Sequence, residues 1–188
     1  MHMLEQRIQQ QFFESADLLG QAAEPLSRPV ADAAQAILHA LTAGGRLFVA
    51  GSDVGAWLAP VLASAFTGRF ERDRPPLAAI ALRPEPGMSM ALQLRALGQP
   101  GDVLLALDPG GVAEPLWQAA EAAHGQDMSV VVLTGADPAA WRNRLAETDV
   151  IIAVPHDRAA RVAETHLLVL HCLCDAVDLQ LMGERESA

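Results

Sequence analysis

The 188-residue sequence predicts an α/β protein whose parallel sheet is covered by helices on both faces. Short apolar segments alternate along the chain with longer segments whose apolar residues follow a helical period. The short segments are apolar on both faces, as strands buried in a parallel sheet are. We therefore expect one domain over residues 1–188, a doubly wound three-layer α/β sandwich with a five-stranded parallel sheet.

The first 43 residues predict two amphipathic helices that precede the sheet. Apolar residues recur at helical spacing over residues 4–19 and again over 30–41, and Pro25 and Pro29 break the chain between them. A five-stranded sheet does not need these helices as cover. We therefore assign residues 1–43 to packing and to an oligomer interface.

The α/β core is predicted over residues 46–155, and a long final helix follows over 159–182. Each strand is short and bounded by turn residues, and each is followed by a helical pattern or a turn. The expected strands cover 47–50, 77–82, 102–107, 129–134 and 150–154, and the expected helices cover 57–67, 89–97, 114–123 and 139–145.

The charge and the cysteines exclude several classes of function. A formal net charge of −10 argues against direct binding to nucleic acid or to an anionic membrane. No segment reaches the ~18 apolar residues of a membrane span, and the polar N-terminus is unlike a signal peptide. Cys172 and Cys174 point to different sides of a helix, so we expect two buried thiols without a disulfide, in the cytoplasm.

The turn after the first strand is the stretch around which the chain is organised. Gly51 and Gly55 flank Ser52 and Asp53, and an alanine-rich helix follows. In an open α/β sheet, a strand, a tight turn and a helix start form the usual place for an anionic ligand. The spacing matches neither a dinucleotide fingerprint nor a P-loop. Two interpretations remain open. The stretch is a ligand-binding loop, or it is a turn in which the glycines only allow the chain to reverse.

Four local strings carry a resemblance to a known family: Arg69-Phe70-Glu71, Arg95-Ala96-Leu97-Gly98, Val132-Leu133-Thr134-Gly135 and His171-Cys172-Leu173-Cys174-Asp175. They resemble the SIS (sugar isomerase) domain family. Within it the likeness is to the phosphoheptose isomerase group, and more closely to the proteins of that group that associate with the DnaA initiator. The likeness runs from Leu4 to about Met182. It implies a five-stranded parallel sheet flanked by helices, assembled as a homotetramer.

The two loops that hold a sugar phosphate in this family are altered here. The family's first loop reads Gly-Asn-Gly-Gly/Thr-Ser, and its second loop is rich in serine and threonine. The matching residues are 51–55, which include Asp53, and 108–113, which begin with Asp108 and contain no hydroxyl. Carboxylates oppose a phosphate, so a sugar phosphate fits poorly. The resemblance thus implies a degenerate pocket made of Gly51, Ser52, Asp53, Gly55, Asp108, Gly110, Gly111 and His171.

Most metal and acid–base residues of the family are replaced as well. The family's His and Glu on the helix after the first loop match Val61 and Ala65, and a Gln on the last helix matches Ala163. Of that set His171 is kept, and a lone histidine is a poor metal site. We therefore predict no catalytic residue, no cofactor and no metal, zinc included. A Glu164–His171 pair on one helix face is the alternative.

Other side chains near the loops carry their own expectations. Ser52 is expected to cap the following helix rather than to contact a ligand. Asp53 and Asp108 are expected to face each other across the sugar site, either as an acid–base pair or as a barrier to anions. Trp57 either fills the vacated pocket or presents an apolar surface. His166 is expected to be a packed helix residue.

Two functional hypotheses follow from these departures. The first is a non-catalytic, homotetrameric adaptor that binds the replication initiator DnaA and regulates initiation, with Leu181 and Met182 as the contact. Ordinary subunit packing of this apolar pair is the alternative. The second hypothesis is a phosphosugar-binding protein, or a phosphoheptose isomerase acting on sedoheptulose 7-phosphate, with a remodelled site.

Overall fold

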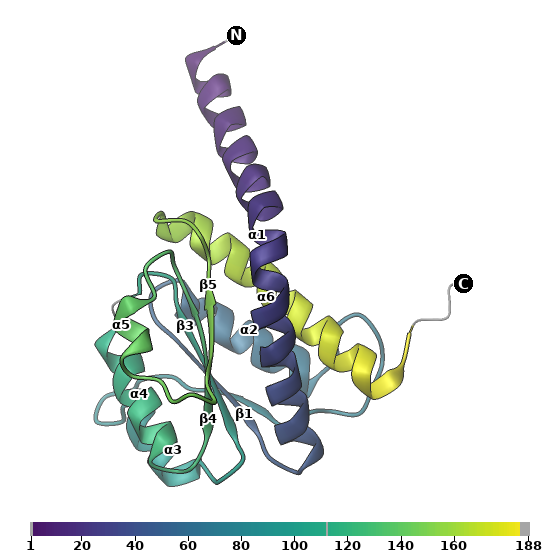
Figure 1. Cartoon of the computed structure of the whole chain (residues 1–188), viewed down its shortest axis with the longest axis vertical. Coiled ribbons are helices and arrows are strands. Elements are labelled where there is room, and N and C mark those ends of the chain that lie inside the picture. The colour runs from purple at the N-terminus through teal and green to yellow at the C-terminus, as the bar shows by residue number, and fades with distance from the viewer. Residues whose placement is uncertain (1, 112, 185–188) are drawn as a thin grey trace.

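The computed structural model describes residues 2–111 and 113–184, and over these residues five strands alternate with six helices (Figure 1). The strand order is β2-β1-β3-β4-β5, and each neighbouring pair is parallel. The predicted three-layer α/β sandwich is confirmed. The strands are β1 (Leu47–Gly51), β2 (Ala79–Ala81), β3 (Val103–Asp108), β4 (Ser129–Thr134) and β5 (Val150–Ala153). The helices are α1 (Met3–Thr42), α2 (Gly55–Thr67), α3 (Met90–Leu97), α4 (Glu114–His124), α5 (Ala139–Arg142) and α6 (Ala159–Met182).

The sheet separates two apolar layers. Val49 and Leu105 point to the side covered by α1, α2 and α6. Their neighbours Phe48 and Leu104 point to the side covered by α3, α4 and α5. Successive strand residues face opposite sides, so strands that are apolar throughout fill both layers. Because both faces of the sheet are buried, each strand is a continuous apolar run in the sequence.

The N-terminal segment is one helix, so the prediction of two helices was wrong. α1 continues for 40 residues through Pro25 and Pro29. Each proline removes one helical N–H and crowds the preceding turn, which disfavours a helix interior. On α1 this cost is outweighed by packing against α6, because Ala22, Leu26 and Ile37 are buried in the layer that the two helices share.

The first half of α1 projects beyond the body of the domain (Figure 1). Near the point where it leaves the domain, Glu14 forms an ion pair with Arg158 and lies 3.4 Å from Nε2 of His156. Five large apolar side chains on the projecting half are exposed, namely Met3, Leu4, Ile8, Phe12 and Phe13.

α6 carries both cysteines, and neither forms a disulfide. Cys174 is buried as predicted. Cys172 is exposed, so the expectation of two buried thiols was wrong, because residues two apart point to different sides of a helix. Among the described residues, no helix is both long and apolar enough to cross a bilayer.

A buried ion pair joins the segment after α2 to α6. Arg74 Nε donates to Oδ1 of Asp178 at 2.5 Å, and the two side chains are 1% and 4% exposed. The same guanidinium donates to the carbonyl oxygens of Ala65 and Phe66 at the end of α2. Arg74 therefore ties α2 to α6.

We expect Asp178→Ala to lower the free energy of unfolding by about 3–5 kcal/mol, because it leaves the Arg74 guanidinium buried without its counter-charge. Asp73→Ala is the matched control, since Asp73 pairs with Arg69 at the exposed surface, and it should change little. Urea denaturation measures both. Equal losses in the two variants would contradict the assignment.

Candidate functional site

The predicted loops meet at the carboxyl ends of β1 and β3. These strands are neighbours, but the chain leaves them in opposite directions, from β1 through α2 to β2 and from β3 through α4 to β4. Such a switch point opens a crevice between the two connections, which is where ligands of open α/β sheets usually bind. The turn over 52–54 and the loop that follows Asp108 meet at this switch point, where Oγ of Ser52 donates to the Asp108 carboxylate.

Close packing requires both glycines of the turn after β1. A Cβ on Gly51 would lie 2.2 Å from the carbonyl carbon and oxygen of Gly55, and a Cβ on Gly55 would lie 2.4 Å from the carbonyl oxygen of Leu107. The amide of Ser52 donates to that same oxygen at 3.0 Å. The glycines therefore hold the turn against β3, which supports the interpretation that they serve the path of the chain.

Asp108 is the centre of the loop after β3. Its side chain is 1% exposed and accepts four hydrogen bonds. Two come from the backbone amides of Gly111, at 3.0 Å, and Ala113, at 3.2 Å. The others come from Oγ of Ser52, at 3.2 Å, and Nε1 of Trp141, at 2.9 Å. One carboxylate thus joins the turn after β1, the start of α4 and the short helix α5.

Ser52 does not cap α2, so that prediction was wrong. Val54 occupies the N-cap position, and its aliphatic side chain has no acceptor for a cap. The Ser52 hydroxyl is instead turned toward Asp108. Asp53 is exposed and has a φ of 48°, a left-handed conformation that aspartate tolerates better than most residues. The two carboxylates therefore have different surroundings. Asp108 is enclosed by donors, whereas the Asp53 side chain is exposed to solvent.

His171 is not brought to these loops within one chain. Its ring lies 5.5 Å from that of Phe70, centroid to centroid, and Phe70 follows the end of α2. The 13 residues of α2 span roughly 20 Å, and Ser52 precedes their start. Glu164 forms an ion pair with Arg161 at 2.6 Å and accepts from Oγ of Ser15, so the alternative of a Glu164–His171 pair is not formed.

The positions that hold the family's metal and acid–base groups carry aliphatic side chains here. Val61 is exposed, Ala65 is half-buried and Ala163 is buried. Aliphatic groups offer no lone pair to a metal, so this donor set does not fit one. In the described part of the chain, no three His, Cys, Asp or Glu side chains gather as a metal-binding group. The absence of a cofactor stays a prediction.

Thr134, at the end of β4, is a buried polar residue for which the sequence predicted no role. Its Oγ1 is fully buried and has no hydrogen-bond partner among the described residues. His166 is packed against the same residue, as its prediction required, with Nε2 3.3 Å from the Thr134 carbonyl oxygen. Burial lowers the pKa of His166 from 6.5 to about 4, so its imidazole is neutral at pH 7.

Trp57 presents an apolar surface and does not fill the pocket, because it is 79% exposed. It lies on one face of α2 with Val54 and Val61, which are also exposed. At the end of α6, Met182 is exposed, whereas Leu181 is half-buried against the core.

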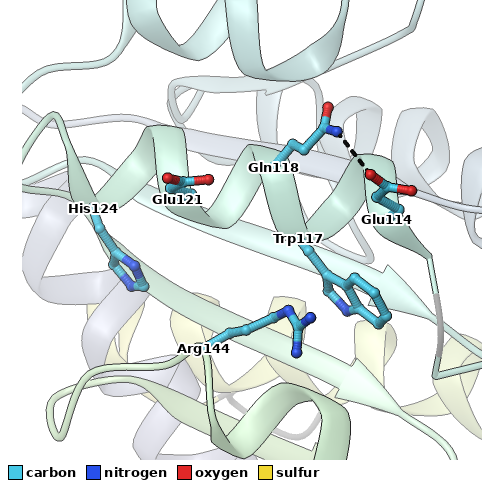
Figure 2. Close-up of a pocket in the computed structure, with 6 residues that line it drawn as sticks. All are labelled: Glu114, Trp117, Gln118, Glu121, His124 and Arg144. Carbon is cyan, nitrogen blue, oxygen red and sulfur yellow. Dashed lines mark hydrogen bonds between the residues drawn. The ribbon is translucent and has the colours of Figure 1, made fainter.

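A separate hollow of about 420 Å³ runs along α4 (Figure 2). It extends from Glu114 at the start of the helix to His124 at its end. Arg144 lies over the ring of Trp117, with 3.9 Å from its guanidinium carbon to the ring centroid. None of the predicted site residues lines this hollow, so it is distinct from the crevice at the end of the sheet.

Comparison with known proteins identifies the family. A model of the SIS domain matches residues 11–135. The chain is 51% identical to the phosphoheptose isomerase of Methylibium petroleiphilum, over 99% of both chains, and 40% identical to that of Azoarcus sp., over 96% of this chain and 98% of the relative. The chain belongs to the SIS domain family, and these relatives place it in the phosphoheptose isomerase group.

Solved structures agree with this assignment. Phosphoheptose isomerase GmhA from Neisseria gonorrhoeae is 33% identical, with a TM-score of 0.87, and the match covers 94% of this chain and 99% of that one. A phosphoheptose isomerase from Francisella tularensis is also 33% identical, with a TM-score of 0.88, over 95% of this chain and 99% of the other.

The predicted non-catalytic adaptor for DnaA was therefore wrong. Relatives that share up to 51% of their residues over the full length are named phosphoheptose isomerases, and nothing in the fold or the comparisons points to DnaA. The error came from equating the loss of familiar loop residues with the loss of activity. The prediction that the chain is not an enzyme was wrong for the same reason.

The buried imidazole of His166 makes stability depend on pH. Its pKa is about 4 in the folded protein, against the ordinary value of 6.5 that we take for the unfolded chain, so the unfolded chain takes up the proton first as pH falls. The contribution of the neutral ring is fully present above pH 6.5 and is lost toward pH 4. Between pH 7 and 4, we expect the free energy of unfolding to fall by about 3 kcal/mol more in the wild type than in His166→Leu.

Urea denaturation at a series of pH values measures this difference. The carboxylates also change the free energy of unfolding over this pH range, but they are the same in the wild type and in His166→Leu. The difference between the two proteins therefore reports on His166. Parallel pH curves for the two proteins would show that His166 is not held neutral by burial.

Proposed function

We propose that the chain is a sugar-phosphate isomerase of the phosphoheptose type with a remodelled site. The observation that carries the proposal is the 51% identity, over 99% of both chains, with a protein named phosphoheptose isomerase. The likeness to two solved isomerases over nearly the whole fold supports it. We place the sugar in the crevice between the turn after β1 and the loop after β3.

Asp53 is the residue to which we assign the proton transfer of the isomerisation. Interconversion of a ketose and an aldose moves a proton between adjacent carbons, which requires a general acid–base group near those carbons. Asp53 is an exposed carboxylate at the crevice, whereas the carboxylate of Asp108 is occupied by four donors. We therefore assign proton transfer to Asp53, and assign Asp108 to holding Ser52 and the second loop in place.

Purified protein should convert sedoheptulose 7-phosphate into an isomeric heptose phosphate, followed by NMR of the sugar, with and without added zinc. Asp53→Ala should lower kcat/KM by about 10²–10⁴-fold because it removes the proton-transfer group. Asp127→Ala is the matched control, since Asp127 is also exposed and also has a positive φ, and it should retain full activity.

No turnover under either condition would contradict the isomerase proposal. If Asp53→Ala has the same turnover as the wild type, the isomerase proposal is supported, but the assignment of proton transfer to Asp53 is contradicted.

We also propose that the protein is a homotetramer that associates through α1 and α6. An apolar hollow of about 410 Å³ lies between these helices, lined on α1 by residues such as Leu19 and Leu26 and on α6 by Leu168. It adds to the exposed apolar side chains on the projecting half of α1. Apolar surface of this extent is typical of an interface between copies. The free thiols fit a cytoplasmic protein.

Replacement of Phe12 and Phe13 together by serine should reduce the mass of the assembly. Both rings are exposed in the single chain, and we expect a second copy to cover them. Light scattering coupled to gel filtration measures the mass. Leu92→Ser is the control, since Leu92 is a similarly exposed apolar residue on α3, on the other side of the sheet. An unchanged mass in the double variant would contradict the role of α1.

A further inference from the structure

The hollow along α4 has charged groups of opposite sign on its two sides. Glu114, Trp117 and Glu121 follow one another at spacings of three and four residues, so their side chains share one face of α4. Arg144 follows α5 and extends toward the Trp117 ring from the other side of the hollow (Figure 2). The volume of about 420 Å³ lies in the range of pockets that hold small organic molecules.

Unused hydrogen-bond donors lie on the side of Arg144. Its guanidinium stacks on the Trp117 ring, and Nη1 donates to the carbonyl oxygen of Ala140 at 2.6 Å. A guanidinium carries five N–H groups, and Arg144 makes no ion pair within the described chain. Nε1 of Trp117 is buried and also has no hydrogen-bond partner among the described residues. Because an unpaired buried N–H is costly, an acceptor that reaches Nε1 stabilises the protein.

An unused carboxylate lies one helical turn away from these donors. Glu121 is four residues after Trp117 on α4, and it forms no hydrogen bond or ion pair with the residues that the structure describes. Glu114 is partly used, since it accepts from Nε2 of Gln118 at 3.3 Å. The hollow therefore offers free donors on Arg144 and a free carboxylate on Glu121, and these groups do not satisfy each other.

We propose that this hollow is a binding site for a small zwitterion of the α-amino acid class. The carboxylate of the ligand accepts from Arg144 and from Nε1 of Trp117, and its ammonium group donates to Glu121. An anion would leave Glu121 without a partner, and a cation would leave Arg144 without one. Arg144 is exposed, so its side chain is free to turn on the Trp117 ring and admit the carboxylate. The site is separate from the crevice and does not rest on the proposed function.

The twenty L-amino acids, each tested singly for its effect on the Tm of the wild type, are the first probes. At least one should raise the Tm by about 2 °C or more, because a ligand that binds the folded chain stabilises it by mass action. The amide of that amino acid lacks the carboxylate, and its N-acetyl derivative lacks the ammonium group. Isothermal titration calorimetry should show that both derivatives bind about tenfold more weakly than the amino acid itself, or worse.

Variants test whether the amino acid lies in the hollow. Arg144→Ala and Glu121→Gln should each raise its Kd about tenfold, since each removes a charge-assisted hydrogen bond. Trp117→Phe keeps a ring under the guanidinium but removes the N–H, and it should raise the Kd about fivefold. Arg142→Ala and Glu147→Gln are the matched controls. Both side chains are exposed and neither lines the hollow, so the Kd should not change.

An unchanged Tm with every amino acid would overturn the proposal. Derivatives that bind as tightly as the amino acid would overturn it as well, and this comparison uses the wild type, so it does not depend on the folding of a variant. Tighter binding by Arg144→Ala would show a site for cations, and an unchanged Kd in all three lining variants would place the amino acid elsewhere. Either result contradicts the proposal. No residue of the crevice is changed and no turnover is measured, so the outcome is independent of the isomerase assay.

Discussion

Four hydrogen bonds to one buried carboxylate hold together the edge of the sheet where the site lies. Asp108 ends β3, and through its acceptors it fixes the turn after β1, the start of α4 and the indole of α5. These segments come from distant parts of the sequence and share no regular secondary structure. Hydrogen bonds to a charged acceptor are among the stronger ones in proteins. The shape of the crevice therefore depends on a carboxylate that is itself buried.

The place of each strand could be predicted from the sequence, although β2 is Ala79–Ala81 where 77–82 was expected and β5 ends one residue before its predicted bound. β4 has the predicted bounds, and β1 and β3 differ by one residue at their ends, because strands buried on both faces leave unbroken apolar runs. The N-terminal segment was predicted to be helical but broken at its prolines, because a proline acts locally, whereas the packing of α1 against α6 joins segments far apart in the sequence. The unfavourable effect of the two prolines was visible in the sequence, whereas the packing that outweighs it was not.

The site was harder to predict than the fold. Sequence alone placed Ser52, Asp53 and Asp108 at the carboxyl ends of the right strands. It could not show which way each side chain turns, and a buried carboxylate and an exposed one look alike in a sequence. The Trp141 donor lies 33 positions from Asp108, and no local pattern pairs them. His171 matched a motif, yet the length of α2 separates it from the loops.

The loss of familiar loop residues was a poor guide to activity, because relatives named isomerases share half of this sequence. We instead place the sugar of an active isomerase in the crevice at the carboxyl ends of β1 and β3. A crystal structure of the protein with sedoheptulose 7-phosphate tests this most directly. The sugar is expected between the turn after β1 and the loop after β3, with its reacting carbons near the carboxylate of Asp53. A sugar bound away from both loops, or bound with its reacting carbons far from Asp53, would contradict this placement.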